Sequence, residues 1–302
     1  PIHKIAVYDS LIWVSDYGNG KIFKSIDDGK TFQKLTTLGS EYFESIQFLD
    51  SKIGFICGDY GYVYKTNDGG ESWIEISPKI KNRINVRFRN DSTKNQKPDG
   101  FFVAYYSMHF ISDSLGFVSG YRYKPKQGFR ESYKSVFFLT KNGGLSWKEL
   151  NKVEKNKTLE NFINIVRASN VYFEKEYFLT KNISWRTAKN KNKSDILIKT
   201  NYKTNFSDTL ILPKTPYKRT MLRSITFLSN NIGFVFGGSL DENNQNAIIY
   251  STNDGGKNWN YVESNIGHIH VAATNDRHLF LFGKQGLMKR IKKQEIIQNK
   301  WH

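Results

Sequence analysis

Short runs in which apolar and polar residues alternate, separated by turn residues, recur along the whole chain. Two of these runs, Tyr62-Val63-Tyr64 and Trp73-Ile74-Glu75-Ile76, have the length and composition of β-strands. Between them lies Asn67-Asp68-Gly69-Gly70. An Asx-Gly core between two β runs is typical of a hairpin turn. The stretch from 62 to 76 therefore predicts two antiparallel strands joined by a tight turn.

An eight-residue pattern surrounds this turn and returns three more times. Its order is a small hydroxyl residue, any residue, an acid or amide, any residue, Gly, any residue, a small polar residue and an aromatic residue. Gly takes the positive φ of the turn, the Asx oxygen accepts backbone N–H bonds, and the hydroxyl holds the other end of the turn. We interpret the octets as structural turns and not as ligand or metal sites. The defining residues are Ser25, Asp27, Gly29 and Phe32; Thr66, Asp68, Gly70 and Trp73; Thr140, Asn142, Gly144 and Trp147; and Thr252, Asp254, Gly256 and Trp259.

A second repeated signature precedes the octets. Phe48 is followed at a fixed interval by Gly54-Phe55, and the same interval separates Phe110 from Gly116-Phe117 and Phe227 from Gly233-Phe234. This spacing predicts an inner strand, a short turn and a second strand, after which a third strand leads into the octet and a fourth leaves it. Four antiparallel strands per unit of roughly 40 to 60 residues predict an all-β fold, the β-propeller, in which each blade is one small sheet.

The repeat divides the chain into six blades within one domain. We expect blades at 1–40, 41–104, 105–152, 153–220, 221–264 and 265–302, with an insertion at 80–104. Within that insertion we expect one short strand, Ile84 to Phe88.

The fourth blade is the degraded one. We expect Ile163 to Val166 and Tyr172-Phe173 to begin it, and Ile196 to Asn201 to lie where an octet would be. Leu179 to Trp185 echoes an octet without its Gly pair, so this region could instead hold two partial blades. Seven blades therefore remain the alternative.

Composition supports the all-β prediction and limits the chemistry. Aromatic residues make up 15% of the chain and there are 23 Gly, as in a protein with many strands and turns. Cys57 is the one cysteine, so an intrachain disulfide or a cysteine metal cluster cannot form. No run approaches the length of a transmembrane segment.

The net charge of +17 suits an anionic partner, although it also fits a solvated surface. The Lys/Asn tracts at 152–157 and 189–193 favour the second interpretation. Nucleic-acid binding would need basic residues interleaved with exposed aromatic residues along a groove, and these tracts do not show that pattern.

Catalytic constellations are weakly supported. A sialidase needs three arginines, a Tyr nucleophile backed by a Glu, and an acid/base Asp, but the Arg-Ile-Pro segment of sialidases is absent. Asp16 and Asp59 share an Asp-Tyr-Gly context, and Asp241 and Glu242 lie in a comparable loop, yet a hairpin turn is the better explanation of Asp-Tyr-Gly. His268 and His270 would share one face of a strand without a third ligand, so we expect no metal and no cofactor.

A binding face is the better hypothesis. Residues at the start of the inner strands, such as Ser45, Ser107 and Ser224, should point toward the mouth of the central channel. Basic and aromatic side chains there would suit an acidic peptide or a glycan. The candidate binding residues are Lys4, Tyr121, Arg122, Tyr123, Arg167, Arg223 and His270.

The repeats resemble two related groups of propellers. The octets resemble the Asp-box, or BNR, repeats of sialidases and other propeller glycosidases. The longer unit from Ile53 to Trp73 is similar to the repeat of photosystem II stability/assembly-factor-like propellers. That resemblance implies a seven-bladed, non-catalytic propeller, usually exported, that assists the assembly of membrane complexes. The six units and the insertions at 80–104 and 153–195 depart from that pattern, so a photosynthetic role is not implied.

The residues and the resemblance together predict a monomeric, non-catalytic propeller that binds a protein or glycan partner, with an acidic partner favoured by charge. The sequence starts at Pro1 with neither Met nor a signal segment, and we interpret it as trimmed. We expect an extracytoplasmic location, whether periplasmic, envelope-associated or secreted. The alternative is a glycoside hydrolase of the Asp-box type, sialidase-like or endo-glucanase-like.

Overall fold

The computed structural model describes most of the chain. The described residues are 2–38, 42–83, 100–110, 112–125, 130–150, 176–180, 183–191, 194–201, 203–204, 206–241, 246–262, 264, 266–275, 277–283 and 288–297. The backbone contacts separate two compact units, which we call the N-terminal unit, His3–Glu154, and the C-terminal unit, Lys155–His302 with Pro1–Ile2.

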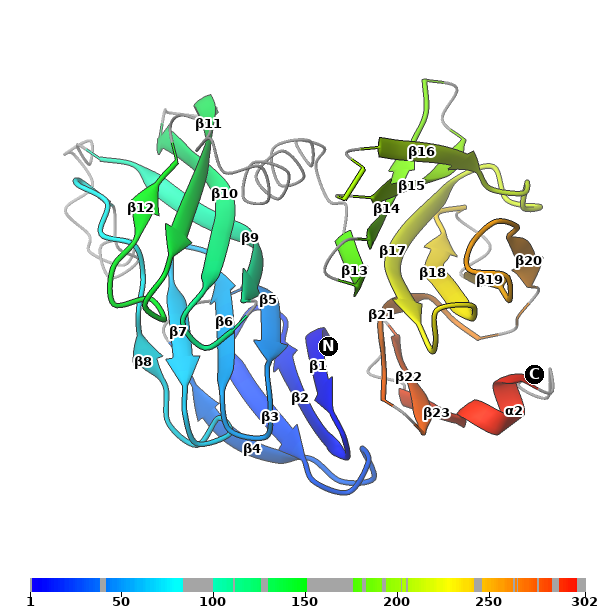
Figure 1. The fold of residues 1–302 in the computed structure, drawn as a ribbon, viewed down its shortest axis with the longest axis horizontal. Coiled ribbons are helices and arrows are strands. Elements are labelled where there is room, and N and C mark those ends of the chain that lie inside the picture. Colours follow the sequence, from blue (N-terminus) through cyan, green and yellow to red (C-terminus); the bar gives the residue numbers. More distant parts are fainter. Residues whose placement is uncertain are drawn as a thin grey trace. The chain divides into compact units, whose positions relative to one another are not determined.

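Three antiparallel sheets form the N-terminal unit, and each follows chain order from its first strand to its fourth (Figure 1). The first sheet contains β1 (Ile2–Tyr8), β2 (Leu11–Asp16), β3 (Lys21–Ser25) and β4 (Gln33–Thr37). The second contains β5 (Phe43–Phe48), β6 (Gly54–Gly58), β7 (Val63–Thr66) and β8 (Ile74–Glu75). The third contains β9 (Phe102–Phe110), β10 (Gly116–Pro125), β11 (Arg130–Thr140) and β12 (Lys148–Glu149).

The C-terminal unit repeats this plan. Its first sheet contains β13 (Glu176–Thr180), β14 (Ile183–Lys189), β15 (Asp195–Asn201) and β16 (Phe206–Ile211). Its second contains β17 (Thr220–Phe227), β18 (Gly233–Ser239), β19 (Ala247–Thr252) and β20 (Asn260–Val262). The last sheet has three described strands, β21 (Ile269–Thr274), β22 (His278–Gly283) and β23 (Met288–Lys292), followed by the short helix α2 (Lys293–Ile297).

The six sheets confirm the predicted all-β fold of antiparallel β-propeller blades. In the echo at Leu179 to Trp185, Leu179 and Thr180 end β13 and Ile183 to Trp185 begin β14. These two strands pair antiparallel, so the described strands of this region belong to one sheet. The third sheet begins at Phe102, three residues before the expected boundary at 105. The expected strands at Ile84–Phe88, Ile163–Val166 and Tyr172–Phe173 lie outside the described residues.

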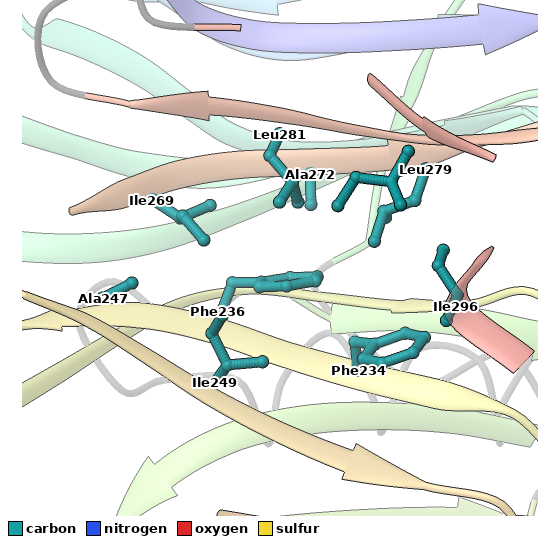
Figure 2. Close-up of a cluster of buried hydrophobic side chains, with 10 residues drawn as sticks. Phe234, Phe236, Ala247, Ile249, Ile269, Ala272, Leu279, Leu281 and Ile296 are labelled. Carbon is teal, nitrogen blue, oxygen red and sulfur yellow. The ribbon is translucent and has the colours of Figure 1, made fainter. Parts of the chain in front are cut away.

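Neighbouring sheets within a unit pack face to face through apolar side chains. In the C-terminal unit, Phe234 and Phe236 of β18 lie against Ile269 of β21 and Leu281 of β22, with Ile296 of α2 closing one end of the cluster (Figure 2). These side chains are almost fully buried. Burial of both sheet faces explains why second strands such as β6 and β18 are almost wholly apolar, since every residue of these two strands is buried.

A cluster of one lysine and three aromatic side chains recurs at the contacts between neighbouring sheets. Trp13 on β2 stacks on Phe48 at the end of β5, with ring centroids 3.6 Å apart, and Trp73 meets the edge of Phe48. Lys24, opposite Trp13 on β3, lies over the Trp13 ring with its Nζ 5.6 Å from the centroid. Such aromatic pairs add about 0.5–1.5 kcal/mol beyond their buried area. The same arrangement recurs as Lys65, Phe55, Phe110 and Trp147, and as Lys199, Trp185, Phe227 and Trp259.

Each octet joins the third strand of its sheet to the fourth. In the second sheet the Thr66 hydroxyl donates to Asp68 Oδ1 (2.7 Å) and accepts the N–H of Gly70 (2.9 Å). Asp68 in turn accepts the N–H of Ser72 (3.0 Å). Asn142 keeps this geometry, and its amide donates to Ser146 Oγ, whereas Asp68 accepts from Ser72. Every defining side chain of the turn is thus engaged by the turn itself.

Candidate functional site

The innermost strands of four sheets carry a β-bulge at the same place. In β5, β9, β17 and β21 one residue is skipped in the pairing with the second strand. Each skipped residue lies four residues before the last residue of its strand. A bulge redirects a side chain relative to the regular alternation of the strand. The skipped residues are Glu44, Tyr106, Arg223 and His270.

A glycine on the second strand permits each bulge. Gly58, Gly120 and Gly237 pair with the residue directly before the bulge. A Cβ on Gly58 would lie 1.9 Å from the carbonyl oxygen of Tyr42, so no side chain fits there. The repeated Gly, visible in the sequence, is the fifth residue of each of these second strands and therefore fixes the position of the bulge.

The bulge positions vary in chemistry although their surroundings are uniform. Ser45, Ser107 and Ser224 follow three of the bulges, and each of these strands ends in Phe. The bulge residues themselves are an acid, a phenol, a guanidinium and an imidazole. Because the scaffold repeats and these side chains do not, the bulge positions are the best candidates for specific recognition.

Lys4 occupies the corresponding place in β1, four residues before Tyr8. Its Nζ lies 2.9 Å from Glu44 Oε2, and both side chains are about four-fifths buried or more. His3 Nε2 lies 3.8 Å from the same carboxylate. Corresponding positions on neighbouring inner strands of the N-terminal unit are thus close enough for a cation to hold a carboxylate.

Aromatic side chains lie beside this ion pair and at the bulge of the third sheet. The His3 and Tyr17 rings meet edge to face at 5.2 Å, and Tyr17 meets Tyr42 at 4.8 Å. Tyr106, at its bulge, contacts Tyr121 of β10 at 5.9 Å. Tyr17 is 52% exposed and Tyr106 is 40% exposed, so both rings remain available to a partner.

The predicted residues Tyr121, Arg122 and Tyr123 lie along β10, where their side chains alternate between the two faces of the sheet. Tyr123 stacks on Phe102 at 5.5 Å. Arg122 lies over the Phe101 ring and 3.8 Å from Glu149. Only Tyr121 of the three joins a bulge residue.

Arg223 and His270 hold the corresponding positions in the C-terminal unit. Their strands are neighbours, because the N–H of Ala272 donates to the Ser224 hydroxyl at 3.1 Å. Arg223 is half-buried and makes neither an ion pair nor a hydrogen bond with the described residues. Burial lowers the pKa of its guanidinium, and no acid among the described residues offsets this effect. Arg167, the remaining predicted residue, lies outside the described part of the chain.

Two of the carboxylates considered for glycoside hydrolysis accept backbone hydrogen bonds. Asp16 accepts the N–H of Lys21 at 2.9 Å. Asp241 accepts the N–H groups of Lys218 and Arg219 at 3.0 and 3.1 Å. Asp59 donates its own N–H to the Tyr42 carbonyl at 3.0 Å, and Glu242 lies outside the described residues.

The described residues contain neither a candidate metal site nor a candidate membrane-spanning helix. No group of three or more His, Cys, Asp or Glu side chains there is arranged to hold a metal ion. No helix in the same residues has the length and hydropathy of a membrane-spanning segment.

Sequence reasoning found three of the bulge-type positions, Lys4, Arg223 and His270, and missed Glu44 and Tyr106. Both missed residues were within reach of the sequence, because each lies at the same interval before the last Phe of its inner strand. The sequence instead predicts that Ser45, Ser107 and Ser224, each one residue after a bulge, point toward the channel mouth. The sequence signal for such a position is its fixed interval before the last Phe of the inner strand. Only the structure shows that the residue at this interval forms a bulge.

These features define the class: the chain has the β-propeller fold. No protein-family model and no curated protein sequence matches it. Among solved structures it is similar to YCF48 bound to D1 peptide, with a TM-score of 0.52 and 14% identity over 97% of this chain and 93% of that one. It is also similar to the WD40 β-propeller domain of Doa1, with a TM-score of 0.54 and 11% identity over 100% of this chain and 97% of that one.

A GH74 xyloglucanase from Xanthomonas campestris matches with a TM-score of 0.48 and 11% identity, over 96% of this chain and 46% of that one. At these identities the similarities concern the fold alone.

Proposed function

We propose that this chain is a non-catalytic propeller that binds a partner macromolecule, a protein or a carbohydrate, through side chains at the bulges of its inner strands. The observation that carries the proposal is Arg223, a half-buried guanidinium without a partner among the described residues. A desolvated charge without a counter-ion is costly, which favours an anionic group supplied by a ligand.

The N-terminal unit provides a template for such a ligand. There Lys4 holds the carboxylate of Glu44 between two neighbouring inner strands. In the C-terminal unit the same two positions are Arg223 and His270, so a cation is present and the acid is not. A carboxylate of the partner would take the place that Glu44 fills in the other unit.

A protein is the first partner to test. YCF48, which shares the fold, is described in complex with a D1 peptide. The exposed rings of Tyr17 and Tyr106 also suit a protein surface, because Tyr and Arg are enriched where proteins recognise one another. The net charge of +17 favours an acidic partner. We further propose an extracytoplasmic location, as the resemblance implies, which fractionation of the native cells tests directly.

Peptide binding tests the site. Acidic, neutral and basic peptides of matched length, together with acidic and neutral oligosaccharides, are titrated against the wild type by fluorescence anisotropy. We expect acidic ligands to bind and Arg223→Gln to weaken them roughly 10- to 100-fold, as loss of a charge-assisted hydrogen bond does. Arg219→Gln is the matched control, because Arg219 is exposed and already lies beside Asp241.

Equal binding by Arg223→Gln and the wild type would overturn the proposed site. Binding of acidic oligosaccharides alone would identify a carbohydrate partner. The alternative, a glycoside hydrolase, requires two carboxylates about 5–10 Å apart and turnover of a glycan. Hydrolysis of any member of a glycan panel, abolished by an Asp or Glu substitution, would replace the binding proposal.

A further inference from the structure

The outermost strand of the fourth sheet, β16, differs from the outermost strands of the other sheets. It contains six residues and five of them are exposed. The corresponding strands β8 and β12 have two residues, β20 has three and β4 has five. Figure 1 shows β16 on the side of β15 that faces away from β14, as the strand order requires.

One row of backbone groups on β16 points away from its sheet. The N–H of Leu212, directly after the strand, donates to the Asp195 carbonyl of β15 at 3.1 Å. Successive residues of a strand direct their polar groups to opposite sides, so the groups of Ser207, Thr209 and Ile211 face outward. Of these, the Thr209 N–H donates to the Asp208 carboxylate at 2.8 Å. The remaining outward groups form no hydrogen bond with the described part of the chain.

Natural edge strands are usually protected against pairing by being short, by carrying Lys or Pro, or by a bulge. The other long edge strand, β4, contains Lys34 and a register shift against β3. By contrast, β16 has neither Lys nor Pro, and it pairs with β15 over six residues without a shift. Phe206 and Ile211, at its two ends, are 63% and 71% exposed.

A second copy of this chain does not fit the edge. When a two-fold axis relates two antiparallel copies of β16, even-numbered residues lie opposite even-numbered residues and odd-numbered residues opposite odd-numbered ones. One such register sets Asp208 against its own copy, which is repulsive. The next sets Thr209 against its copy and Asp208 against Leu210, a charge against an apolar side chain. A net charge of +17 further opposes self-association.

We propose that β16 accepts an extended segment of another protein as a fifth strand of this sheet. Main-chain bonds to Ser207, Ile211 and the Thr209 carbonyl would provide affinity, and alternate side chains would provide specificity. The segment has apolar residues against Phe206 and Ile211 and a Lys or Arg against Asp208. Asp208 forms no ion pair with the described residues, because Lys199 opposite it on β15 lies over the Trp185 ring at 5.0 Å.

Two synthetic peptides test the proposal with the intact protein. Both have nine residues, with Lys or Glu at the centre to lie opposite Asp208. Val occupies positions 2 and 7, which lie opposite Ile211 and Phe206 in an antiparallel pairing, and Thr occupies the others. We expect the Lys peptide to bind roughly three- to tenfold more tightly than the Glu peptide, as cross-strand charge pairs do. Asp208→Lys should reverse the preference. Hydrogen exchange should show protection of Ser207 and Ile211 amides upon binding.

Two variants distinguish edge pairing from other contacts. Thr209→Pro blocks the edge without removing a bond to β15, because the Thr209 N–H faces outward. Phe206→Ser with Ile211→Ser removes the apolar anchors and changes only exposed side chains. Both variants should lose peptide binding, whereas Ile26→Ser, at an equally exposed site 71% accessible, should not.

The proposal fails if the two peptides bind the wild type equally, if Asp208→Lys leaves the preference unchanged, or if Ser207 and Ile211 gain no protection. Arg223→Gln should bind both peptides like the wild type. Loss of peptide binding in Arg223→Gln would contradict an edge site that is separate from the Arg223 site. Because the two sites are tested by different variants, a negative result at one site does not affect the interpretation of the other.

Discussion

The ammonium of Lys4 lies 2.9 Å from the carboxylate of Glu44, and the two residues occupy corresponding positions on neighbouring inner strands. Arg223 and His270 occupy the same pair of positions in the other unit. A glutamate at position 270 should therefore meet Arg223 as Glu44 meets Lys4.

His270→Glu is expected to stabilise the protein by up to about 1 kcal/mol, since the new pair is only partly buried. It should also abolish binding of acidic peptides, because the variant supplies its own carboxylate. Thermal unfolding and anisotropy measure the two effects, with His270→Gln as control. Equal stability and equal peptide binding in the two variants would contradict the correspondence between the units.

The stack of Trp13 on Phe48 should be a main determinant of stability in the N-terminal unit. Phe48 is 8% exposed and contacts both Trp13 and Trp73. We expect Phe48→Ala to lower the free energy of unfolding by about 3–5 kcal/mol, measured by urea denaturation. Ile74→Ala, at a site 60% exposed, should cost less than about 0.5 kcal/mol. Similar losses in both variants would show that the stack is not a stabilising element.

The octet hydroxyl can be tested with a substitution of the same shape. Thr66→Val removes the acceptor of the Gly70 N–H, which lies in a buried turn. Leaving that N–H without a partner should cost about 1–3 kcal/mol, and Gly70 should lose protection in hydrogen exchange. Thr66→Ser keeps the hydroxyl and should remain close to wild type. A stable Thr66→Val variant with a protected Gly70 would refute a structural role for the hydroxyl.

The Asp68 octet should lose stability in acid. Burial alone would raise the pKa of Asp68, but hydrogen bonds from Ser72 and Thr66 outweigh it and lower this pKa from 3.8 to about 2. The unfolded chain therefore takes up the proton first, and the stabilisation declines as the pH falls from about 4 to about 2. Asp68→Asn should remove this part of the decline, since Asn142 already serves in another octet. An unchanged acid titration of the melting temperature would disprove the assignment.

His109 on β9 should produce a second pH dependence at milder acidity. Burial lowers its pKa from 6.5 to about 4. As the pH falls through this range the unfolded chain binds a proton that the folded chain does not, so stability should decrease between about 6.5 and 4. His109→Gln should abolish that decrease in a series of urea titrations. If the slope persists in the variant, another group causes it.

The sequence alone determined the repeated local structure of this protein. Alternating apolar runs, Asx-Gly turns and the interval from Phe48 to Gly54 predicted antiparallel sheets, six blades and the octet hairpins, because strand period and turn geometry depend on neighbouring residues. The same local reasoning could not resolve the fourth blade. Trp185 is the last residue of a sequence that echoes an octet, and only the pairing of β13 with β14 places it in a second strand.

The tertiary structure decided which side chains are candidates for recognition. That Lys4 reaches Glu44 and that Arg223 has no acid among the described residues depend on contacts between strands distant in sequence. That β16 is an edge strand among the described strands follows from the order of strands in its sheet. Locating the bulges required both the sequence and the tertiary structure. The glycines Gly58, Gly120 and Gly237 are visible in the sequence, but their consequence follows only when the partner carbonyl approaches within 2.1 Å of the place where a Cβ would be.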